Sequence, residues 1–299
     1  MVDFIQNILD GIANGSAYAL LALGFTLIFG VLGSLNLAFG PSIMIGLYAA
    51  AFLYQRWGLP PLLLMPVAVG GAVVAGIYVE RLCFAWSKPG AGLAAMVASF
   101  AIWMQLEEVA TLVMPRHSYP LPALADGAMF GIGPFLLRGD YLGMLAIAAL
   151  VTFALERLIR HSQFGLRLQA VAEAPRAARF MGIRIERVLL SAFILASAIG
   201  GIGGFLIVTA EQQITPMFGM WATFKGLTAM MIGGLGSLPG AVVGGLLLGI
   251  IEAQAHWYGG AQIRELAAFL VLFLMLVLRP AGLLGASQAE RLAAAHGRL

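Results

Sequence analysis

The sequence predicts an all-α fold, a polytopic transmembrane helical bundle, from its composition and from the length of its apolar runs. Hydrophobic residues are 61% of the chain and charged residues only 10%, whereas about 25% of an ordinary soluble domain is charged. The mean hydropathy is +0.94, and so apolar a soluble fold would have too few polar residues to cover its surface. The continuous runs reach about 20 residues, the length of a membrane-spanning helix, and exclude the short alternating strands of a β-barrel.

Nine apolar segments of the chain could each cross the bilayer as a helix. Their approximate ranges are 10–31, 41–55, 60–82, 92–114, 141–159, 188–210, 221–236, 238–257 and 263–279. Several of these segments are short or interrupted by glycine, so eight spans fit the sequence as well as nine. We therefore expect broken or short helices, with one break in the Gly-rich stretch 33–41 and another between 233 and 240.

Arginine placement predicts the orientation, because cytoplasmic loops carry an excess of Lys and Arg. The segment 156–187 holds Arg157, Arg160, Arg167, Arg176, Arg179, Arg184 and Arg187. Further basic residues follow the third and the last span, and with nine spans all three regions lie on one side. We expect this side to be cytoplasmic, with the N-terminus outside. Residues 1–285 would form the membrane domain, with a cytoplasmic loop at about 160–187, and 286–299 a short cytoplasmic tail.

Several function classes find no support in the sequence. The basic pI of about 9.2 does not indicate nucleic-acid binding, because positive-inside topology explains the basic loops. The two lysines, Lys88 and Lys225, do not follow the Gly-Lys-Ser/Thr pattern of a phosphate-binding loop, so any ATPase must be another subunit. Cys83 is alone and the four histidines lack metal-ligand spacing. We expect no metal site, no cofactor and no enzymatic activity of this chain.

The cytoplasmic loop contains a candidate docking helix over 170–182. The stretch is rich in alanine, Pro175 suits a first helical turn, and Gly182 would end the helix. Two apolar side chains near its end could enter a cleft of a partner, while the arginines face acidic rims. The alternative is a solvated loop that only sets topology. The residues predicted for docking are Glu173, Ala174, Arg176, Arg179, Phe180, Met181 and Gly182.

Four of the charged residues inside the apolar spans are candidates for a role in the pathway or in pairing, because an unpaired charge there is costly. They are Glu107, Glu108, Lys225 and Glu252, and all lie toward the predicted outer ends of their spans, where they can reach interfacial water. An outer vestibule with Lys225 near Glu252 or Glu108 is one interpretation, and interfacial pairs that stabilise the bundle are the other. The absence of a chain of midplane carboxylates in the sequence argues against transport coupled to protons or sodium.

Four groups of motifs follow one another along the chain. They are 24–32 with 36–40, then 164–165 with 172–174 and 181–183, then 224–228 with 233–241 and 244–245, and finally 278–285. In this order they resemble the branched-chain amino acid ABC transporter permeases, and the LivH type more closely than the LivM type. One departure is Phe39, where the family often has His in an Asn-x-Ala-His-Gly pattern. Phe39 cannot form that hydrogen bond, so a difference in substrate or gate is expected if the His contacts substrate.

The resemblance implies the fold of the large-permease ABC importers and a bacterial inner-membrane location. It implies a second, LivM-like permease, two cytoplasmic P-loop ATPase subunits that dock on coupling helices, and a periplasmic substrate-binding protein, all assembled in membrane lipid without nucleic acid. The substrates implied are branched-chain or other hydrophobic amino acids. The family also covers urea, short amides and other small carboxylates.

Polar and break-associated residues are the candidates for the lining of the pathway. They are Asn14, Ser16, Thr26, Asn36, Phe39, Ser42, Thr228 and Ser237. Each polar one is about as well explained by a hydrogen bond between helices. A stand-alone channel or facilitator also fits the Gly-rich spans but gives the Arg-rich loop no role, and a secondary transporter needs an ion site that the sequence does not show.

Overall fold

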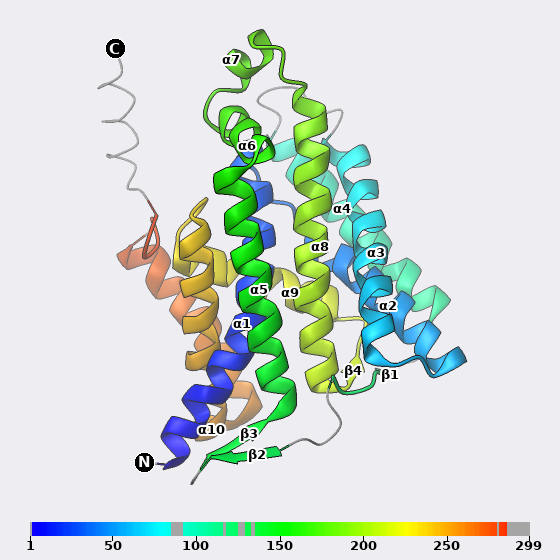
Figure 1. Ribbon diagram of the computed structural model, residues 1–299, viewed down its shortest axis with the longest axis vertical. Helices are drawn as coiled ribbons and strands as arrows, with labels where there is room; N and C mark the ends of the chain where they lie inside the picture. The colour runs from blue at the N-terminus through cyan, green and yellow to red at the C-terminus, as the bar shows by residue number, and fades with distance from the viewer. Residues whose placement is uncertain are drawn as a thin grey trace.

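The computed structural model describes residues 2–84, 92–115, 118–124, 129–132, 135–279 and 281–285, which form a helical bundle (Figure 1). The predicted tail, 286–299, lies outside these residues. The helices within them are α1 (Val2–Leu32), α2 (Phe39–Trp57), α3 (Pro61–Val79), α4 (Gly92–Val113), α5 (Gly139–His161), α6 (Gln163–Glu173), α7 (Pro175–Phe180), α8 (Ile185–Glu211), α9 (Phe218–Gly233) and α10 (Leu238–Leu278), with a π-helical turn, η1 (Glu80–Phe84), after α3.

Each of the nine segments expected to span the membrane is helical. The last two lie in α10, which Gly260 breaks with non-helical angles of φ 79° and ψ −176°. In Figure 1, α10 runs toward the end of the bundle that holds the N-terminus and then turns back. By length and composition, six helices of the described chain are long and apolar enough to cross a membrane, and α2 and α9 are not among them. The 16 residues of α9 reach about 24 Å, less than a bilayer core of about 30 Å.

Two long helices, α1 and α8, form the inside of the bundle. In each, 78% of the residues in an apolar stretch of 18 residues are buried, against 28% in α4 and 22% in α5. Around α1 lie α5, α8, α9 and α10, which is why apolar residues occur on all of its sides. The outer helices therefore present their apolar faces to lipid or to other subunits.

The break at Gly260 divides α10 into a first arm, before Gly260, and a second arm, after it. Glycines bring the first arm close to α1. A Cβ on Gly249 would meet the backbone of Gly11 and Gly15, and one on Gly245 would meet Ala19. Gly245 and Gly249 have small-xxx-small spacing, which here allows close packing of the two helices. The loop between Gly234 and Ser237 is the break expected between 233 and 240.

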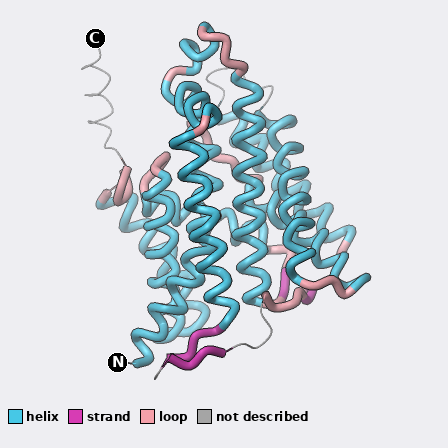
Figure 2. The backbone as a smooth tube through the Cα atoms, viewed as in Figure 1, coloured by secondary structure: helices cyan, strands magenta, loops and turns pink. Residues whose placement is uncertain are grey.

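Small sheets supplement the all-α bundle at the end that holds the N-terminus (Figure 2). The strands β2 (Met129–Ile132) and β3 (Phe135–Arg138) pair in antiparallel fashion. A second pair joins β1 (Tyr119–Pro120) to β4 (Gln213–Ile214), and so ties the segment after α4 to the end of α8. Helices α6 and α7 lie at the opposite end of the bundle (Figure 1).

Candidate functional site

The predicted docking segment is two helices rather than one. Residues 170–173 are the end of α6, and Ala174 (φ −147°, ψ 78°) leaves the helical region before α7 begins at Pro175. The single helix expected over 170–182 was therefore wrong at its start. The reason is Pro175, whose ring disfavours a helical residue before it but suits the first turn of the next helix. Pro175 in the first turn agrees with the prediction, and Ala174 is the N-cap of α7.

The end of α7 exposes an apolar pair. Gly182 has a φ of 81°, its N–H donates to the Arg179 carbonyl at 3.0 Å, and the Ile183 N–H donates to Ala178 at 3.0 Å. This turn ends the helix in a left-handed residue that glycine tolerates best. Phe180 is 94% exposed and Met181 71% exposed. They belong to the end of α7 and the turn after it, which we call the tip, and α7 lies at the end of the bundle opposite the N-terminus (Figure 1). Two such side chains in contact with solvent form a surface that a partner could bury.

The charges around this tip are mostly exposed. Arg179 lies 3.7 Å from Glu186, and both side chains are about two-thirds exposed. Arg176 and Glu173 are exposed as well. Ion pairs of this kind contribute little to stability, so the tip keeps its charges accessible.

A second group of charged residues is buried where four helical segments meet. Lys225 of α9 and Glu252 of the first arm of α10 form an ion pair with 2.5 Å between Nζ and Oε1. Arg264 of the second arm donates from Nε to Glu252 Oε2 at 3.0 Å and from Nη2 to the Tyr18 hydroxyl of α1 at 2.6 Å. The Tyr18 hydroxyl donates to Glu252 at 3.1 Å. Three donors thus hold one buried carboxylate, a satisfied arrangement that ties α1, α9 and both arms of α10 together.

Glu265 adds a more exposed carboxylate to this group. Its Oε2 lies 3.1 Å from Lys225 Nζ, and its side chain is 45% exposed. The sequence correctly suggested the pair between Lys225 and Glu252, but the expected contact of these two with interfacial water was wrong. Their side chains are only 3% and 2% exposed. Lys225 pairs with Glu252 and Glu265, and not with Glu108, within the described chain.

Two cavities flank this buried charge cluster. One, of about 150 Å³, is polar and includes Asn14, Tyr18, Glu252, His256 and Arg264 in its wall. The other, of about 390 Å³, is lined by Met217, Met220, Trp221, Phe224, Lys225, Thr228, Glu265, Ala268 and Phe269. Its wall is therefore mainly apolar, with an ammonium and a carboxylate at one side, which is the usual composition of a small-molecule site.

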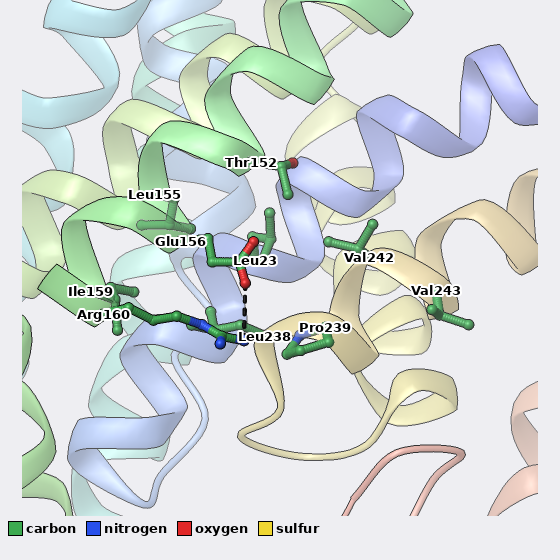
Figure 3. A pocket seen from close by; sticks show the side chains of 10 residues that line it. All are labelled: Leu23, Thr152, Leu155, Glu156, Ile159, Arg160, Leu238, Pro239, Val242 and Val243. Carbon is green, nitrogen blue, oxygen red and sulfur yellow. Dashed lines mark ion pairs between the residues drawn. The ribbon is translucent and has the colours of Figure 1, made fainter.

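A third cavity lies between α1, α5 and α10, and its wall includes Ile159 and Arg160 of the last turns of α5 (Figure 3). It measures about 330 Å³, and most of its wall is apolar, including Leu23, Leu155 and Val242. Glu156 and Arg160 of α5 form an ion pair of 2.9 Å at its wall, and both are more than half exposed. The carboxylate here is already matched by the neighbouring guanidinium one helical turn away.

Four of the eight predicted pathway residues form hydrogen bonds within their own helix or turn. The Ser16 hydroxyl donates to the Ala13 carbonyl at 2.6 Å, and that of Ser42 donates to Ala38 at 2.7 Å. Asn36 accepts from the Ala38 N–H at 3.1 Å in the turn before α2. Ser237 is the N-cap of α10 and accepts from the Gly240 N–H at 3.2 Å.

The remaining four divide between the core and the cavities. Phe39 is 1% exposed and packs edge-on against Phe25, with ring centroids 4.6 Å apart. Thr26 is buried, and its hydroxyl has no hydrogen-bond partner in the described part of the chain. Asn14 and Thr228 line the two cavities beside the charge cluster. The eight residues are therefore not brought together into one site.

Comparison with known proteins identifies the family. Residues 7–278 match the model of the family described as branched-chain amino acid transport system, permease component. The chain belongs to this permease family. It is 31% identical to the high-affinity branched-chain amino acid transport permease LivH of Escherichia coli K12 over 300 residues, which cover 96% of this chain and 97% of LivH. This permease is also 31% identical to BraD of Pseudomonas aeruginosa, over 96% of this chain and 98% of BraD.

A solved structure shares the fold of this permease. The structure of PsaBC from Streptococcus pneumoniae in complex with Fab superposes with a TM-score of 0.53 at 12% identity, covering 98% of this chain and 95% of that chain. At this identity the likeness concerns the fold alone. It supports the helical arrangement from which the cavities and the α6–α7 tip are built.

The sequence reasoning missed Tyr18, Arg264 and Glu265. Tyr18 lies in an apolar stretch of α1, and Arg264 and Glu265 fall at the start of the ninth predicted span. A buried Lys beside a buried Glu still requires partners for its remaining hydrogen-bond donors and acceptors. This requirement is the signal in the sequence, and Arg264 and Glu265, in the next apolar segment after Glu252, could have been named as those partners.

Proposed function

We propose that this permease is the membrane subunit of an ATP-driven ABC importer of branched-chain or other hydrophobic amino acids, or of similar small polar solutes. It forms part of the translocation pathway and docks separate ATPase subunits. The observation that carries this proposal is the family match over residues 7–278, nearly the whole described bundle. LivH and BraD, which it resembles along their whole lengths, are named as branched-chain amino acid transport permeases.

The proposed assembly contains a second, LivM-like permease, two cytoplasmic P-loop ATPases and a periplasmic substrate-binding protein in a bacterial inner membrane. Residues 1–285 are its membrane domain, with the coupling loop at about 160–187 and a short cytoplasmic tail from 286. The α6–α7 end faces the cytoplasm and the N-terminus lies outside. Support comes from the arginine-rich loop and from the position of α7 at the end opposite the N-terminus (Figure 1).

The tip at α7 is the docking element in this proposal. Phe180 and Met181, exposed at the end of the helix, enter a cleft of the ATPase, and Arg176 and Arg179 face its acidic rim. Glu173, Ala174 and Gly182 set where α7 begins and ends. Because α5 leads into the tip and α8 leaves it, a displacement of α7 moves two long helices of the bundle. ATP supplies the shift through its stronger binding to the closed ATPase dimer.

Purification in mild detergent tests the assembly. The tagged permease is expected to co-purify with a second permease and with P-loop ATPases, identified by mass spectrometry. Recovery of this chain alone, still active for solute flux in liposomes, would overturn the importer and favour a stand-alone channel or facilitator.

A double variant tests the coupling role of α7. Arg176→Glu with Phe180→Ala is expected to abolish the coupling between ATP hydrolysis and uptake while membrane insertion stays normal. Trp57→Ala is the control, because Trp57 is 65% exposed but lies at the end of α2, away from α7. Normal uptake by the double variant would remove the docking assignment.

A further inference from the structure

The cavity of about 390 Å³ beside Lys225 combines an aromatic wall with two opposite charges. The rings of Phe224 and Phe269 are 6.0 Å apart in an edge-on contact, and the Trp103 ring of α4 lies 6.3 Å from Phe224. Lys225 Nζ is 5.5 Å from the centre of the Trp221 ring. An apolar side chain of a ligand can therefore pack on rings while its polar end reaches Lys225 and Glu265.

The two carboxylates on Lys225 are held very differently. Lys225, Arg264 and the Tyr18 hydroxyl all contact Glu252, which is 2% exposed. Glu265 is held by Lys225 at 3.1 Å, and its side chain is 45% exposed beside the cavity. Removing Glu252 from the cluster would break three polar contacts. Glu265, which is held by this one contact within the described residues, can leave Lys225 by rotating its own side chain.

We propose that this cavity is a binding site for an amino acid zwitterion with an apolar side chain, and that binding exchanges the ion pair between Lys225 and Glu265. The α-carboxylate of the ligand takes the place of Glu265 on Lys225 Nζ. The α-ammonium of the ligand pairs with the released Glu265. The apolar side chain of the ligand packs on the rings of Trp221, Phe224 and Phe269 and forms no hydrogen bond with Lys225 or Glu265. This inference rests on the proposed function and locates the substrate within it.

The exchange leaves each buried charge with a partner. Before binding, Lys225 faces Glu252 and Glu265; after binding, it faces Glu252 and the ligand carboxylate, and Glu265 faces the ligand ammonium. A zwitterion fits this scheme because it adds one charge of each sign. A ligand with a carboxylate but no ammonium would leave Glu265 unpaired. A ligand with an ammonium but no carboxylate would leave Lys225 with one partner fewer. In both cases a charged group would lose its partner and its desolvation would not be offset. The site therefore selects α-amino acids by charge balance.

Photo-crosslinking of the complete transporter tests the site. The transporter, with its partner subunits, is reconstituted in nanodiscs and irradiated with photo-leucine, a leucine analogue with a diazirine in its aliphatic side chain. Peptide mapping is expected to place the label within 217–228 and 265–269. Leucine should compete with this label. Neither 4-methylpentanoate, which lacks the ammonium, nor 3-methylbutylamine, which lacks the carboxylate, should compete at the same concentration.

Variants sharpen the test. Glu265→Gln is expected to lower labelling roughly 10-fold or more, since a charge-assisted contact is lost. Glu156→Gln is its control, a carboxylate at the wall of the other large cavity, and should label as the original chain does. Phe269→Ala should also lower labelling, whereas Phe273→Ala, which alters an exposed ring of the same arm that does not line the cavity, should not.

The outcomes separate this site from the transport function. If the original transporter imports leucine with ATP but the label is absent from the cavity, or if either single-charge analogue competes as well as leucine, the site is wrong and the importer stands. Unchanged labelling of folded Glu265→Gln would also overturn the ion-pair exchange. If that variant does not fold, the competition pattern of the original chain still decides. If neither an amino acid nor a similar small polar solute is imported with ATP, the proposed function itself fails.

Discussion

Two charged regions of this permease, the buried cluster around Lys225 and the exposed tip at α7, use charge in opposite ways. In the cluster, Glu252 is 2% exposed and accepts from Lys225, Arg264 and Tyr18. At the tip, Arg179 and Glu186 are about two-thirds exposed and lie 3.7 Å apart. One region satisfies its charges internally, whereas the other leaves them to solvent.

The surroundings explain this difference. An unpaired charge near the bilayer centre costs about 2.5–3.5 kcal/mol on insertion scales, so a charge within the bundle needs a partner from another helix. At the tip, water solvates the arginines, and partners add little. Buried charged residues therefore indicate which helices must stay in contact. Exposed charged residues beside exposed apolar side chains indicate a surface where another protein can bind.

Breaking the cluster should give the largest effect. Glu252→Gln leaves Arg264 and Lys225 with one buried counter-charge fewer, and we expect a loss of about 3–5 kcal/mol in stability. Thermal unfolding in detergent, followed by size-exclusion chromatography, measures it as a lower midpoint. The matched control is Glu186→Gln at the tip, which should unfold as the original chain does. Equal midpoints for the two variants would contradict the contrast between the regions.

Removing the exposed ring at the tip should affect a partner rather than the fold. Phe180→Ala is expected to weaken ATPase binding by about 2–4 kcal/mol, because a buried aromatic anchor dominates many interfaces. Titration of the ATPase onto reconstituted permease measures the affinity, and the unfolding midpoint should not change. Phe153→Ala, which removes a ring that is 66% exposed on α5, serves as control. Equal affinities for both variants would exclude α7 as the main contact.

A helix contact next to the cluster should show an intermediate effect. Gly249→Ala places a Cβ against the backbone of Gly11 and Gly15, and overpacking of this kind costs about 1–3 kcal/mol. Gly30→Ala in α1 is the control, because no group of a neighbouring element among the described residues lies within 4 Å of its added Cβ, and alanine is the better helix former. The unfolding midpoint should fall for the first variant alone. A fall of similar size in both variants would show that the close contact of Gly249 with Gly11 and Gly15 does not distinguish the two positions.

Much of the bundle follows from local patterns. Apolar length predicted the helices, and the Gly-rich break before α10 followed from turn residues that interrupt the apolar run. Pro175 and Gly182 marked the beginning and end of α7. The expected start at residue 170 failed because residues 170–173 continue α6 as far as Glu173, and the non-helical Ala174 separates the two helices. Local propensity does not say which of two helices a shared alanine joins.

The site was less accessible to sequence reasoning, because its partners are far apart in the chain. Tyr18 and Glu252 are 234 residues apart, and Lys225 and Glu252 are 27 apart. Polarity by itself also cannot separate a residue that bonds its own helix from one that faces a cavity. Ser16 and Asn14 are neighbours in α1, yet Ser16 bonds the Ala13 carbonyl and Asn14 lines the polar cavity. The two cases are distinguished only when it is known which neighbouring helix or cavity each face of α1 contacts.

The smallest expected effect concerns Arg179, and it tests the tip most directly. Arg179→Ala removes an ion pair that is long and mostly exposed. The free energy of unfolding should therefore change by less than about 0.5 kcal/mol, and the unfolding midpoint should hardly move. If Arg179 faces an acidic rim, the association rate of the ATPase should fall, and the difference from the original chain should disappear at high salt. Arg187→Ala, another exposed arginine of the loop, controls for net charge. A loss of stability as large as that of Glu252→Gln would mean that the tip is held internally, like the cluster, and is not free to dock.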